Sequence, residues 1–318
     1  MKYTISQPQS FFERGQRDNQ EDAMFPSLGA ATIDSRTFVV CDGMGGHEKG
    51  EVASNVVCDT FAKHANKLLD FTPEKLSQAL SDAYDALDAA DTSKKAKKMG
   101  TTLTFLQLHS QGASIAHIGD SRVYYVSPSK NDFFVTTDHS LVQSFYDAGL
   151  ITKEEMKHHP QRNIISRVMM PHQPNRAEAT INHISDIRPG DYFLLCSDGV
   201  VENMEDNQIK DLLCDQELSD AEKCEKLKKL TEWNSDNHTA YIIHIEDVQE
   251  DSDSNAIDWE SCSVPLLEIN DTQSKPSISE TNLQNKPLKP QTAKSSKLKF
   301  IIAIISFLIA VILGMMFF

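Results

Sequence analysis

Seven short runs rich in β-branched and aromatic residues recur through the first 245 residues of this 318-residue chain. Such runs favour β-strands, and few of the segments between them are long enough for the crossover that joins parallel strands. We therefore expect an α+β domain in which helices cover antiparallel sheets, and not a doubly wound fold. The expected strands are Thr37–Cys41, Thr102–Leu108, Ser114–Ile118, Arg122–Val126, Phe133–Thr136, Tyr192–Cys196 and Ala240–Ile245.

Five other stretches of this region have the character of helices. Thr72 and Pro73 open one of them as N-cap and first helical residue, and Asp206 is expected to cap another. Between two of the expected strands, Gly119 and Asp120 resemble a hairpin turn. The expected helices cover residues 49–69, 73–90, 139–148, 207–214 and 219–233.

Residues 300–318, FIIAIISFLIAVILGMMFF, contain no charged side chain. A helix of this length reaches roughly 28 Å, close to the hydrocarbon thickness of a bilayer at about 30 Å. Lys294, Lys297 and Lys299 precede the run, and this lysine excess predicts that the preceding chain lies on the cytoplasmic side. We expect a single-pass C-terminal anchor in the cell membrane, with the rest of the protein in the cytoplasm.

Residues 247–299 are rich in Ser, Asn, Gln, Pro and charge, and they show no sustained period of a strand or a helix. That composition predicts a disordered linker. The chain is thus expected to consist of a folded domain over residues 1–246, a linker over 247–299 and a transmembrane helix over 300–318.

The chain holds 46 acidic and 31 basic residues, which gives a formal net charge of -15. This balance argues against a nucleic-acid binder, which needs Lys and Arg to replace phosphate counterions. It fits either a solubilising surface or a site for hard cations. The six cysteines include no CxxC pair, and Cys41 and Cys196 lie inside apolar runs, so we expect reduced thiols in an intracellular protein. No basic-plus-apolar segment opens the sequence, and none is expected to act as a secretory signal.

Aspartates recur where the apolar runs end or begin, and most of them adjoin a glycine. They are Asp42, Asp120, Asp198 and Asp236. A strand end holds a carboxylate rigidly, and hard cations such as Mg²⁺ and Mn²⁺ require several oxygen ligands at fixed positions. A single Asp-Gly pair more often marks only a turn. Four such carboxylates in one domain make a divalent-metal site an equally good interpretation.

Residues 14–23, RGQRDNQEDA, add a second charged constellation. The guanidinium fork of Arg17 suits bidentate recognition of phosphate, and Glu21 and Asp22 are suited to holding water around a cation. In isolation the same segment also fits a charged surface loop.

The charged segment and the Asp-Gly pairs belong to an ordered series of motifs along the chain. The motifs are Gly15-Gln16-Arg17 with Glu21-Asp22-Ala23, Val40–His47, Gly100–Leu103, Gly119–Arg122, Asp138–Val142, Asn163–Arg167, Pro189-Gly190-Asp191 with Ser197-Asp198-Gly199, and Asp236-Asn237. In this order they resemble the motifs of the metal-dependent Ser/Thr protein phosphatases of the 2C type. The resemblance covers residues 10–245, and Asp42-Gly43-Met44-Gly45-Gly46 is similar to the bacterial subtype of the family.

The resemblance implies an αββα sandwich, in which two antiparallel sheets pack face to face between outer helices. It also implies two Mn²⁺ or Mg²⁺ ions, and a weaker third, with a water between the first two that attacks the phosphoester directly. The implied ligands are Asp42 for both main ions, the Gly43 carbonyl for one of them, and Asp198 and Asp236 for the other. Asp120, with Asp198, is the implied ligand of the third ion.

Three further residues receive catalytic roles from the resemblance. Arg17 matches the phosphate-binding arginine, and Glu21 and Asp22 match carboxylates that hold metal-bound waters. Met44 stands where eukaryotic-type relatives often carry a histidine, so the general acid is left open. The roles of His47, of Met169-Met170 beside the flap over residues 141–171, and of His238 are also left open.

The expected function is hydrolysis of phosphoserine and phosphothreonine on the cytoplasmic face of the membrane, opposing a Ser/Thr kinase. The expected partners are phosphorylated Ser/Thr proteins, a cognate kinase and the membrane, with a monomeric catalytic domain and no nucleic acid. Two alternatives stay open: a catalytically silent scaffold that binds phosphoproteins, and a two-metal enzyme that acts on another phosphoester such as a nucleotide.

Overall fold

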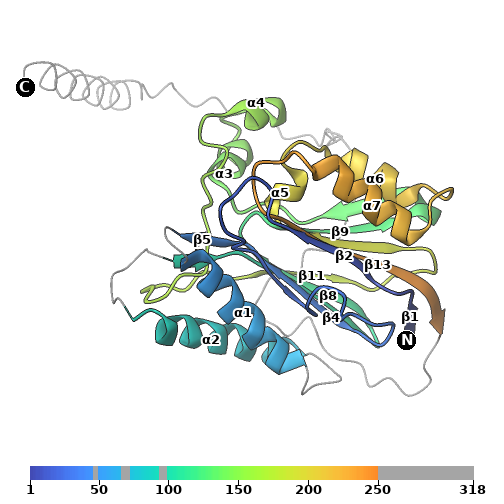
Figure 1. Cartoon of the computed structure of the whole chain (residues 1–318), viewed down its shortest axis with the longest axis horizontal. Coiled ribbons are helices and arrows are strands. Elements are labelled where there is room, and N and C mark those ends of the chain that lie inside the picture. The colour runs from blue at the N-terminus through green and yellow to red at the C-terminus, as the bar shows by residue number, and fades with distance from the viewer. Residues whose placement is uncertain (46–48, 66–71, 93–98, 250–318) are drawn as a thin grey trace, which may run out of the picture. The chain divides into compact units, whose positions relative to one another are not determined.

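The computed structural model describes residues 1–45, 49–65, 72–92 and 99–249. These residues form two larger antiparallel sheets and a two-stranded ribbon (Figure 1). The five-stranded sheet has the order β11 (Thr180–Ile184), β8 (Gly112–Ile118), β7 (Leu103–His109), β4 (Thr37–Cys41) and β3 (Ala23–Phe25). The six-stranded sheet has the order β1 (Lys2–Ile5), β13 (His238–Gln249), β12 (Tyr192–Cys196), β9 (Arg122–Ser127) and β10 (Asp132–Val135), and β2 (Gln9–Glu13) also pairs with β13. The ribbon consists of β5 (Gly43–Gly45) and β6 (Met99–Thr101).

Helices cover the outer faces of the two sheets (Figure 1). α1 (Lys49–Ala65) and α2 (Pro73–Ala90) pack on the five-stranded sheet. α5 (Asp198–Val201), α6 (Asp206–Cys214) and α7 (Asp220–Thr231) pack on the six-stranded sheet. α3 (Leu141–Asp147), α4 (Lys153–His158) and a short 3₁₀ turn, Pro128–Lys130, lie in the connections. The expected α+β fold of antiparallel sheets between helices is therefore confirmed.

The inner strands β4, β7, β8 and β12 are buried on both faces, which explains why their sequences are largely apolar runs. In β4, Phe38 and Val40 belong to the core between the two sheets, while Val39 and Cys41 face α1 and α2. β12 alternates in the same way between the central core and the layer beneath α5, α6 and α7. This period of two gives three stacked apolar layers.

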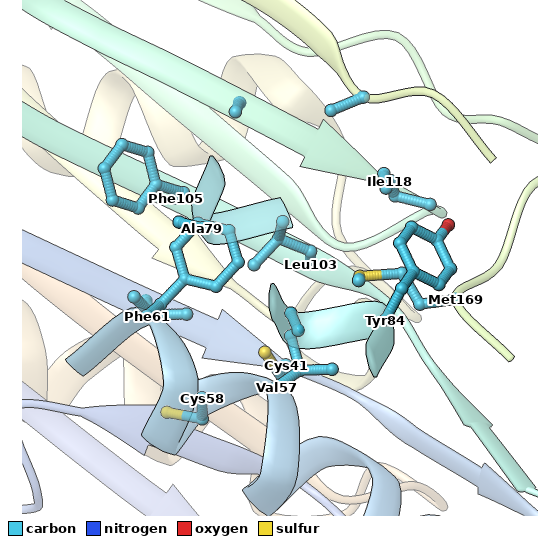
Figure 2. Packing of buried hydrophobic residues seen from close by; sticks show 14 of the residues in the cluster. Cys41, Val57, Cys58, Phe61, Ala79, Tyr84, Leu103, Phe105, Ile118 and Met169 are labelled. Carbon is cyan, nitrogen blue, oxygen red and sulfur yellow. The ribbon is translucent and has the colours of Figure 1, made fainter. Parts of the chain in front are cut away.

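The layer under α1 and α2 joins helix and sheet through aromatic packing (Figure 2). The rings of Phe61 in α1 and Phe105 in β7 lie 5.4 Å apart between centroids. Cys41 and Cys58 are buried in the same layer, as small apolar side chains. The five cysteines among the described residues carry free thiols, and Cys262 lies outside them.

The structure corrects two of the local predictions. Gly119-Asp120 does not close a hairpin, because β8 belongs to the five-stranded sheet and β9 to the six-stranded one. The turn carries the chain from one sheet to the other. Asp206 is the first residue of α6 and not its cap, because Glu205 and Gln208 form a capping box one position earlier.

Other differences lie at the ends of elements and in short elements that the sequence did not indicate. β13 continues to Gln249, where it pairs with Lys2, so the folded domain extends past residue 246. The unexpected elements are β1, β2, β3, β5, β6, β11, α4 and α5. Within the described part of the chain, no helix combines the length and the apolar character needed to span a bilayer. The expected anchor over 300–318 lies outside the described residues, as does the expected linker from residue 250 onward.

Candidate functional site

Strand register places the acidic residues in pairs at one end of each sheet. β3 and β4 pair Ala23 with Cys41, so Asp22 and Asp42 adjoin the same pair of residues. β12 and β13 pair Cys196 with Ala240, which brings Asp198 and Asp236 to a common edge of the other sheet. Antiparallel pairing thus converts positions far apart in the sequence into neighbours.

The two pairs meet where the sheets lie against each other. The carboxyl groups of Asp42 and Asp198 lie within hydrogen-bonding reach of one another. Asp120, in the crossing from β8 to β9, adds a third carboxylate that interacts electrostatically with both. The four aspartates predicted from the strand ends are therefore brought to one region.

Backbone segments approach closely at this region, and two glycines make the approach feasible. A Cβ atom at Gly43 would lie 2.3 Å from the Gly50 carbonyl oxygen, and one at Gly199 would lie 2.0 Å from the Asn237 carbonyl oxygen. Both distances are too short for any side chain, so glycine is required after Asp42 and after Asp198. The prediction that these glycines allow close backbone approach is confirmed.

Burial and mutual repulsion destabilise the ionised form of these carboxylates when no cation is bound. Burial raises the pKa of Asp42 well above its usual range, and the charges of Asp198, Asp22 and Asp120 raise it further. Burial and the charge of Asp198 likewise hold the pKa of Asp120 high. One oxygen each of Asp22, Asp120 and Asp198 is buried without a hydrogen-bond partner. Buried polar atoms are almost always paired, so these oxygens indicate ligands, and their chemistry fits hard divalent cations.

The described residues contain no group of three or more His, Cys, Asp or Glu side chains gathered closely enough to cage a metal ion. Asp236 forms an ion pair with Arg17, in which Oδ2 of Asp236 lies 2.5 Å from Nη2 of Arg17. Mg²⁺ commonly keeps several waters and uses only one or two carboxylates. The site therefore fits hydrated cations shared among several aspartates better than a closed protein cage.

Arg17 lies at the solvent-facing side of the cluster, with 56% of its side chain exposed. Burial lowers the pKa of this guanidinium, but the charges of Asp236, Asp42 and Asp198 outweigh that effect and raise it. A permanently charged, accessible fork beside the carboxylates is suited to receive a phosphoryl group. The structure places Arg17 beside Asp236, one of the predicted metal ligands, and the role of Arg17 stays a prediction.

Glu21 and Asp22 have different surroundings although they adjoin. Glu21 is half-buried, and burial followed by the charges of Asp236 and Glu51 raises its pKa against the influence of Arg17. Asp22 is 2% exposed, accepts a hydrogen bond from Ser197 Oγ at 2.8 Å, and has a pKa raised by burial to about 7. The alternative of a plain surface loop is therefore wrong for Asp22.

Several residues that hold the site in place were not assigned roles from the sequence. Asn237 accepts from the Glu21 amide and donates to the Arg14 and Asn19 carbonyls, at 2.8 to 2.9 Å. Thr102 Oγ1 accepts from the Asp42 amide at 2.9 Å and lies 2.8 Å from Ser121 Oγ. Their only sequence signal was membership of the motifs, because the partners lie far away along the chain.

The structure accounts for two residues left open. His238 is 2% exposed, and its Nδ1 lies 3.0 Å from the Asp236 carbonyl, to which it must donate. It therefore fixes the backbone beside a predicted ligand. Met169 is fully buried under α2 and exchanges two backbone hydrogen bonds with Thr101 (Figure 2). This bond pair attaches the end of the 141–171 segment to β6, beside the site. His47 lies outside the described residues.

Comparison with known proteins shows which family has this sequence and this fold. A family model described as protein phosphatase 2C matches residues 14–233. The serine/threonine protein phosphatase PstP of Mycobacterium tuberculosis is 34% identical over 211 residues, which cover 64% of this chain and 38% of PstP. The protein phosphatase PhpP of Streptococcus pneumoniae is 31% identical over 216 residues, which cover 66% of this chain and 85% of PhpP. A crystal structure of the PstP catalytic domain with two manganese ions superposes with a TM-score of 0.63 at 29% identity, covering 76% of this chain and 99% of that one.

Proposed function

This chain belongs to the protein phosphatase 2C family, and we propose that it hydrolyses phosphoserine and phosphothreonine in proteins with two Mn²⁺ or Mg²⁺ ions. The observation that carries the proposal is the cluster of Asp42, Asp120 and Asp198 beside the accessible guanidinium of Arg17. Asp120 and Asp198 each have one buried oxygen without a hydrogen-bond partner. Two manganese ions in the related PstP catalytic domain support the choice of cation.

The residues divide the work of phosphoester hydrolysis between them. The cations, when bound, lower the pKa of water and neutralise charge on the phosphoryl oxygens. Asp42 from one sheet and Asp198 from the other would hold them, and Asp236 and the Gly43 carbonyl would complete the ligand set. Arg17 binds the remaining phosphoryl oxygens and orients the ester for in-line attack.

A phosphocysteine intermediate does not fit this site. Cys41, which directly precedes Asp42, is fully buried, and burial keeps the pKa of its thiol well above the ordinary value. A thiol nucleophile must be accessible and ionised. The chemistry therefore belongs to the carboxylates and to Arg17.

The decisive experiment compares the full chain with its Asp42→Asn variant on a phosphothreonine peptide with Mn²⁺. The variant should lose about 100-fold or more in turnover, because several kcal/mol of transition-state stabilisation depend on the cations that Asp42 holds. Asp34→Asn, on an exposed loop, is the matched control and should leave turnover unchanged. Equal activity of wild type and Asp42→Asn would contradict the proposal.

A second readout separates loss of the metal site from loss of the fold. Mn²⁺ at about 100 times its dissociation constant should stabilise the wild-type fold by about 2.7 kcal/mol, and thermal unfolding should show a smaller increase for Asp42→Asn. A panel with nucleotides and phosphopeptides tests the alternative substrate class. Preference for a nucleotide would replace the protein-phosphatase assignment, and metal-independent phosphopeptide binding without turnover would favour the silent scaffold.

The proposed enzyme works at the cytoplasmic face of the cell membrane, where residues 300–318 anchor it. The uncharged length of this run and the preceding Lys294, Lys297 and Lys299 support that location. Its substrates are membrane-proximal phosphoproteins, and since hydrolysis consumes phosphoserine and phosphothreonine, a Ser/Thr kinase must supply them. The catalytic domain acts as a monomer, because each group of its site comes from one chain.

A further inference from the structure

An exposed aromatic side chain borders the proposed active site. Trp233 follows the last turn of α7 and is 79% exposed, and Leu230, one turn earlier in α7, is 55% exposed. We call these two residues the Trp233 shelf. Glu232 keeps helical dihedral angles, so Trp233 lies about one helical turn beyond Leu230 and the two side chains leave α7 toward the same side. The indole ring is therefore accessible to a ligand that binds at the adjoining site.

The backbone beneath the shelf is held on several sides. Gln16 Nε2 donates to the Trp233 carbonyl at 3.0 Å. Asn234, the next residue, is 3% exposed, donates to the Gly199 carbonyl at 2.6 Å and accepts from Asn203 at 2.9 Å. The Ser235 amide and hydroxyl both donate to Glu202. The ring therefore projects from a fixed segment, and little conformational entropy would be lost when a ligand binds it.

The same hydrogen bonds connect the shelf to the reacting groups. Gln16 directly precedes Arg17, and Asp236 follows Trp233 by three residues, so the Cα atoms of Trp233 and Asp236 are separated by no more than about 11 Å. Arg17 and Asp236 are themselves bonded to each other. A peptide whose phosphate binds at Arg17 therefore needs only a few residues to reach Trp233.

We propose that the Trp233 shelf binds an apolar side chain of the phosphoprotein substrate, two to four residues from the phosphorylated Ser or Thr. The inference rests on the proposed function and names the feature of the substrate that this side of the site selects. The shelf belongs to the surface beside Arg17, where the residues that flank a bound phosphate would lie. Leu230 beside the ring selects an apolar side chain, and Trp is the residue type most often found to dominate such contacts.

The experiment uses the full chain with Mn²⁺ and three substrates. Two are phosphothreonine peptides that differ only in carrying Leu or Ser at one position, scanned over the second to fourth residues on either side of the phosphothreonine. The third is p-nitrophenyl phosphate, which has no flanking residues. Wild type should prefer the Leu peptide at one of these positions, through a lower KM.

Trp233→Ala should raise the KM of the Leu peptide about 10-fold and remove the preference over the Ser peptide. Its kcat/KM for p-nitrophenyl phosphate should stay within about twofold, because the shelf does not contact the reacting atoms. Trp233→Phe should restore most of the preference. Ile33→Ala, at an exposed apolar residue in the loop between β3 and β4, is the matched control and should change nothing.

The outcomes separate this inference from the proposed function. If wild type hydrolyses none of the substrates, the proposed function fails. If wild type and Trp233→Ala hydrolyse all peptides with the same KM, the shelf has no role in substrate binding although the enzyme assignment stands. An Arg peptide of the same series tests a cationic occupant: if it is preferred over the Leu peptide and the preference depends on Trp233, a cation–π contact replaces the apolar occupant. Association of the chain that disappears in Trp233→Ala would show that a second copy occupies the shelf.

Discussion

The carboxamide of Asn237 makes three hydrogen bonds to the segment that carries Arg17 and Glu21. The residue is 4% exposed, so water cannot readily replace these bonds. It follows Asp236, and its own carbonyl lies against Gly199. One side chain therefore fixes the position of Arg17, the proposed phosphate-binding residue, relative to two of the predicted metal ligands.

Asn237→Ala should lower the free energy of unfolding by about 2–3 kcal/mol, because two carbonyls and one amide lose their partner in a buried place. It should also raise the KM for a phosphopeptide, since Arg17 is no longer held, while Mn²⁺ still stabilises the fold. Urea unfolding and steady-state kinetics measure the two effects. Asn55→Ala, on the exposed side of α1, is the control. Unchanged stability and KM in Asn237→Ala would show that the segment with Arg17 and Glu21 keeps its position without this carboxamide.

The residues of the site differ in how far the sequence could predict them. Asp42, Asp120, Asp198 and Asp236 follow a local rule, because each adjoins an apolar run and the end of a strand holds a carboxylate. Ser197, Thr102 and Asn237 act through partners 60 to 223 residues away in the chain. No local pattern contains such a pair, so their roles required the fold.

For helices and strands too, the difference between local sequence signals and long-range pairing separates a confirmed prediction from a wrong one. α2 was predicted with its boundaries, because Thr72 accepts a hydrogen bond from the Lys75 amide and Pro73 occupies the first turn. Those signals lie within four residues. The turn at Gly119-Asp120 has the same local chemistry as a hairpin, but β8 pairs with β7 and β11 while β9 pairs with β10 and β12. The pairing of β8 with β11 and of β9 with β12 joins strands far apart in the sequence. Short strands such as β3 and β11 form only by pairing with another strand.

The junction of α7, β12 and β13 depends on one half-buried carboxylate. Asp220, the first residue of α7, accepts hydrogen bonds from Tyr192 of β12 at 2.9 Å and Ser6 at 2.6 Å, and lies 2.9 Å from His244 Nδ1 of β13. Burial raises the pKa of Asp220, but the hydrogen bonds from His244, Ser6 and Tyr192 outweigh it and lower the pKa to about 2. The carboxylate form thus joins a helix to two strands.

Asp220→Asn should lower the free energy of unfolding by about 2 kcal/mol at pH 7, since a pKa depressed by roughly two units stabilises the fold by about that amount. A depressed carboxyl pKa stabilises the fold above the unfolded value of about 3.8, and the effect is lost as the pH falls toward 2. The difference between wild type and variant should therefore shrink over that range. Denaturant unfolding from pH 7 down to pH 3 measures it, with Asp211→Asn on the exposed side of α6 as control. A difference that stays constant with pH would mean that the carboxylate charge contributes nothing.

In the molecule as a whole, the candidate site is formed by residues from both sheets of the sandwich. Asp42 extends from the five-stranded sheet and Asp198 from the six-stranded one, and the apolar core between them fixes their separation. The repulsion between these buried carboxylates opposes folding, so cation binding should stabilise the domain as well as supply its chemistry. The formal net charge of -15 overstates the negative charge that a phosphate meets at the loaded site.

The location of this domain decides which phosphoproteins it reaches. If residues 250–299 form the flexible linker that their composition predicts, its root-mean-square span is about 35–45 Å, and the domain searches a shell of that depth at the membrane. Placing enzyme and substrate in one shell raises their effective concentration without any new contact. Removing residues 300–318 should therefore leave hydrolysis of a soluble phosphopeptide unchanged and slow dephosphorylation of a membrane-bound phosphoprotein in cells.

Two variants separate anchoring from the mere presence of the segment. Arginine at Ile305 and Leu308 together (Ile305→Arg, Leu308→Arg) adds about 2.5–3.5 kcal/mol per residue to the free energy of insertion at the helix centre, and should act like the deletion. Replacing residues 300–318 with an unrelated apolar segment of equal length should restore wild-type behaviour, because only the span is needed. Membrane fractionation and phosphorylation of the membrane substrate are measured side by side. Full dephosphorylation by the soluble forms at equal abundance would mean that tethering does not select the substrate, and that the Trp233 shelf and Arg17 select it alone.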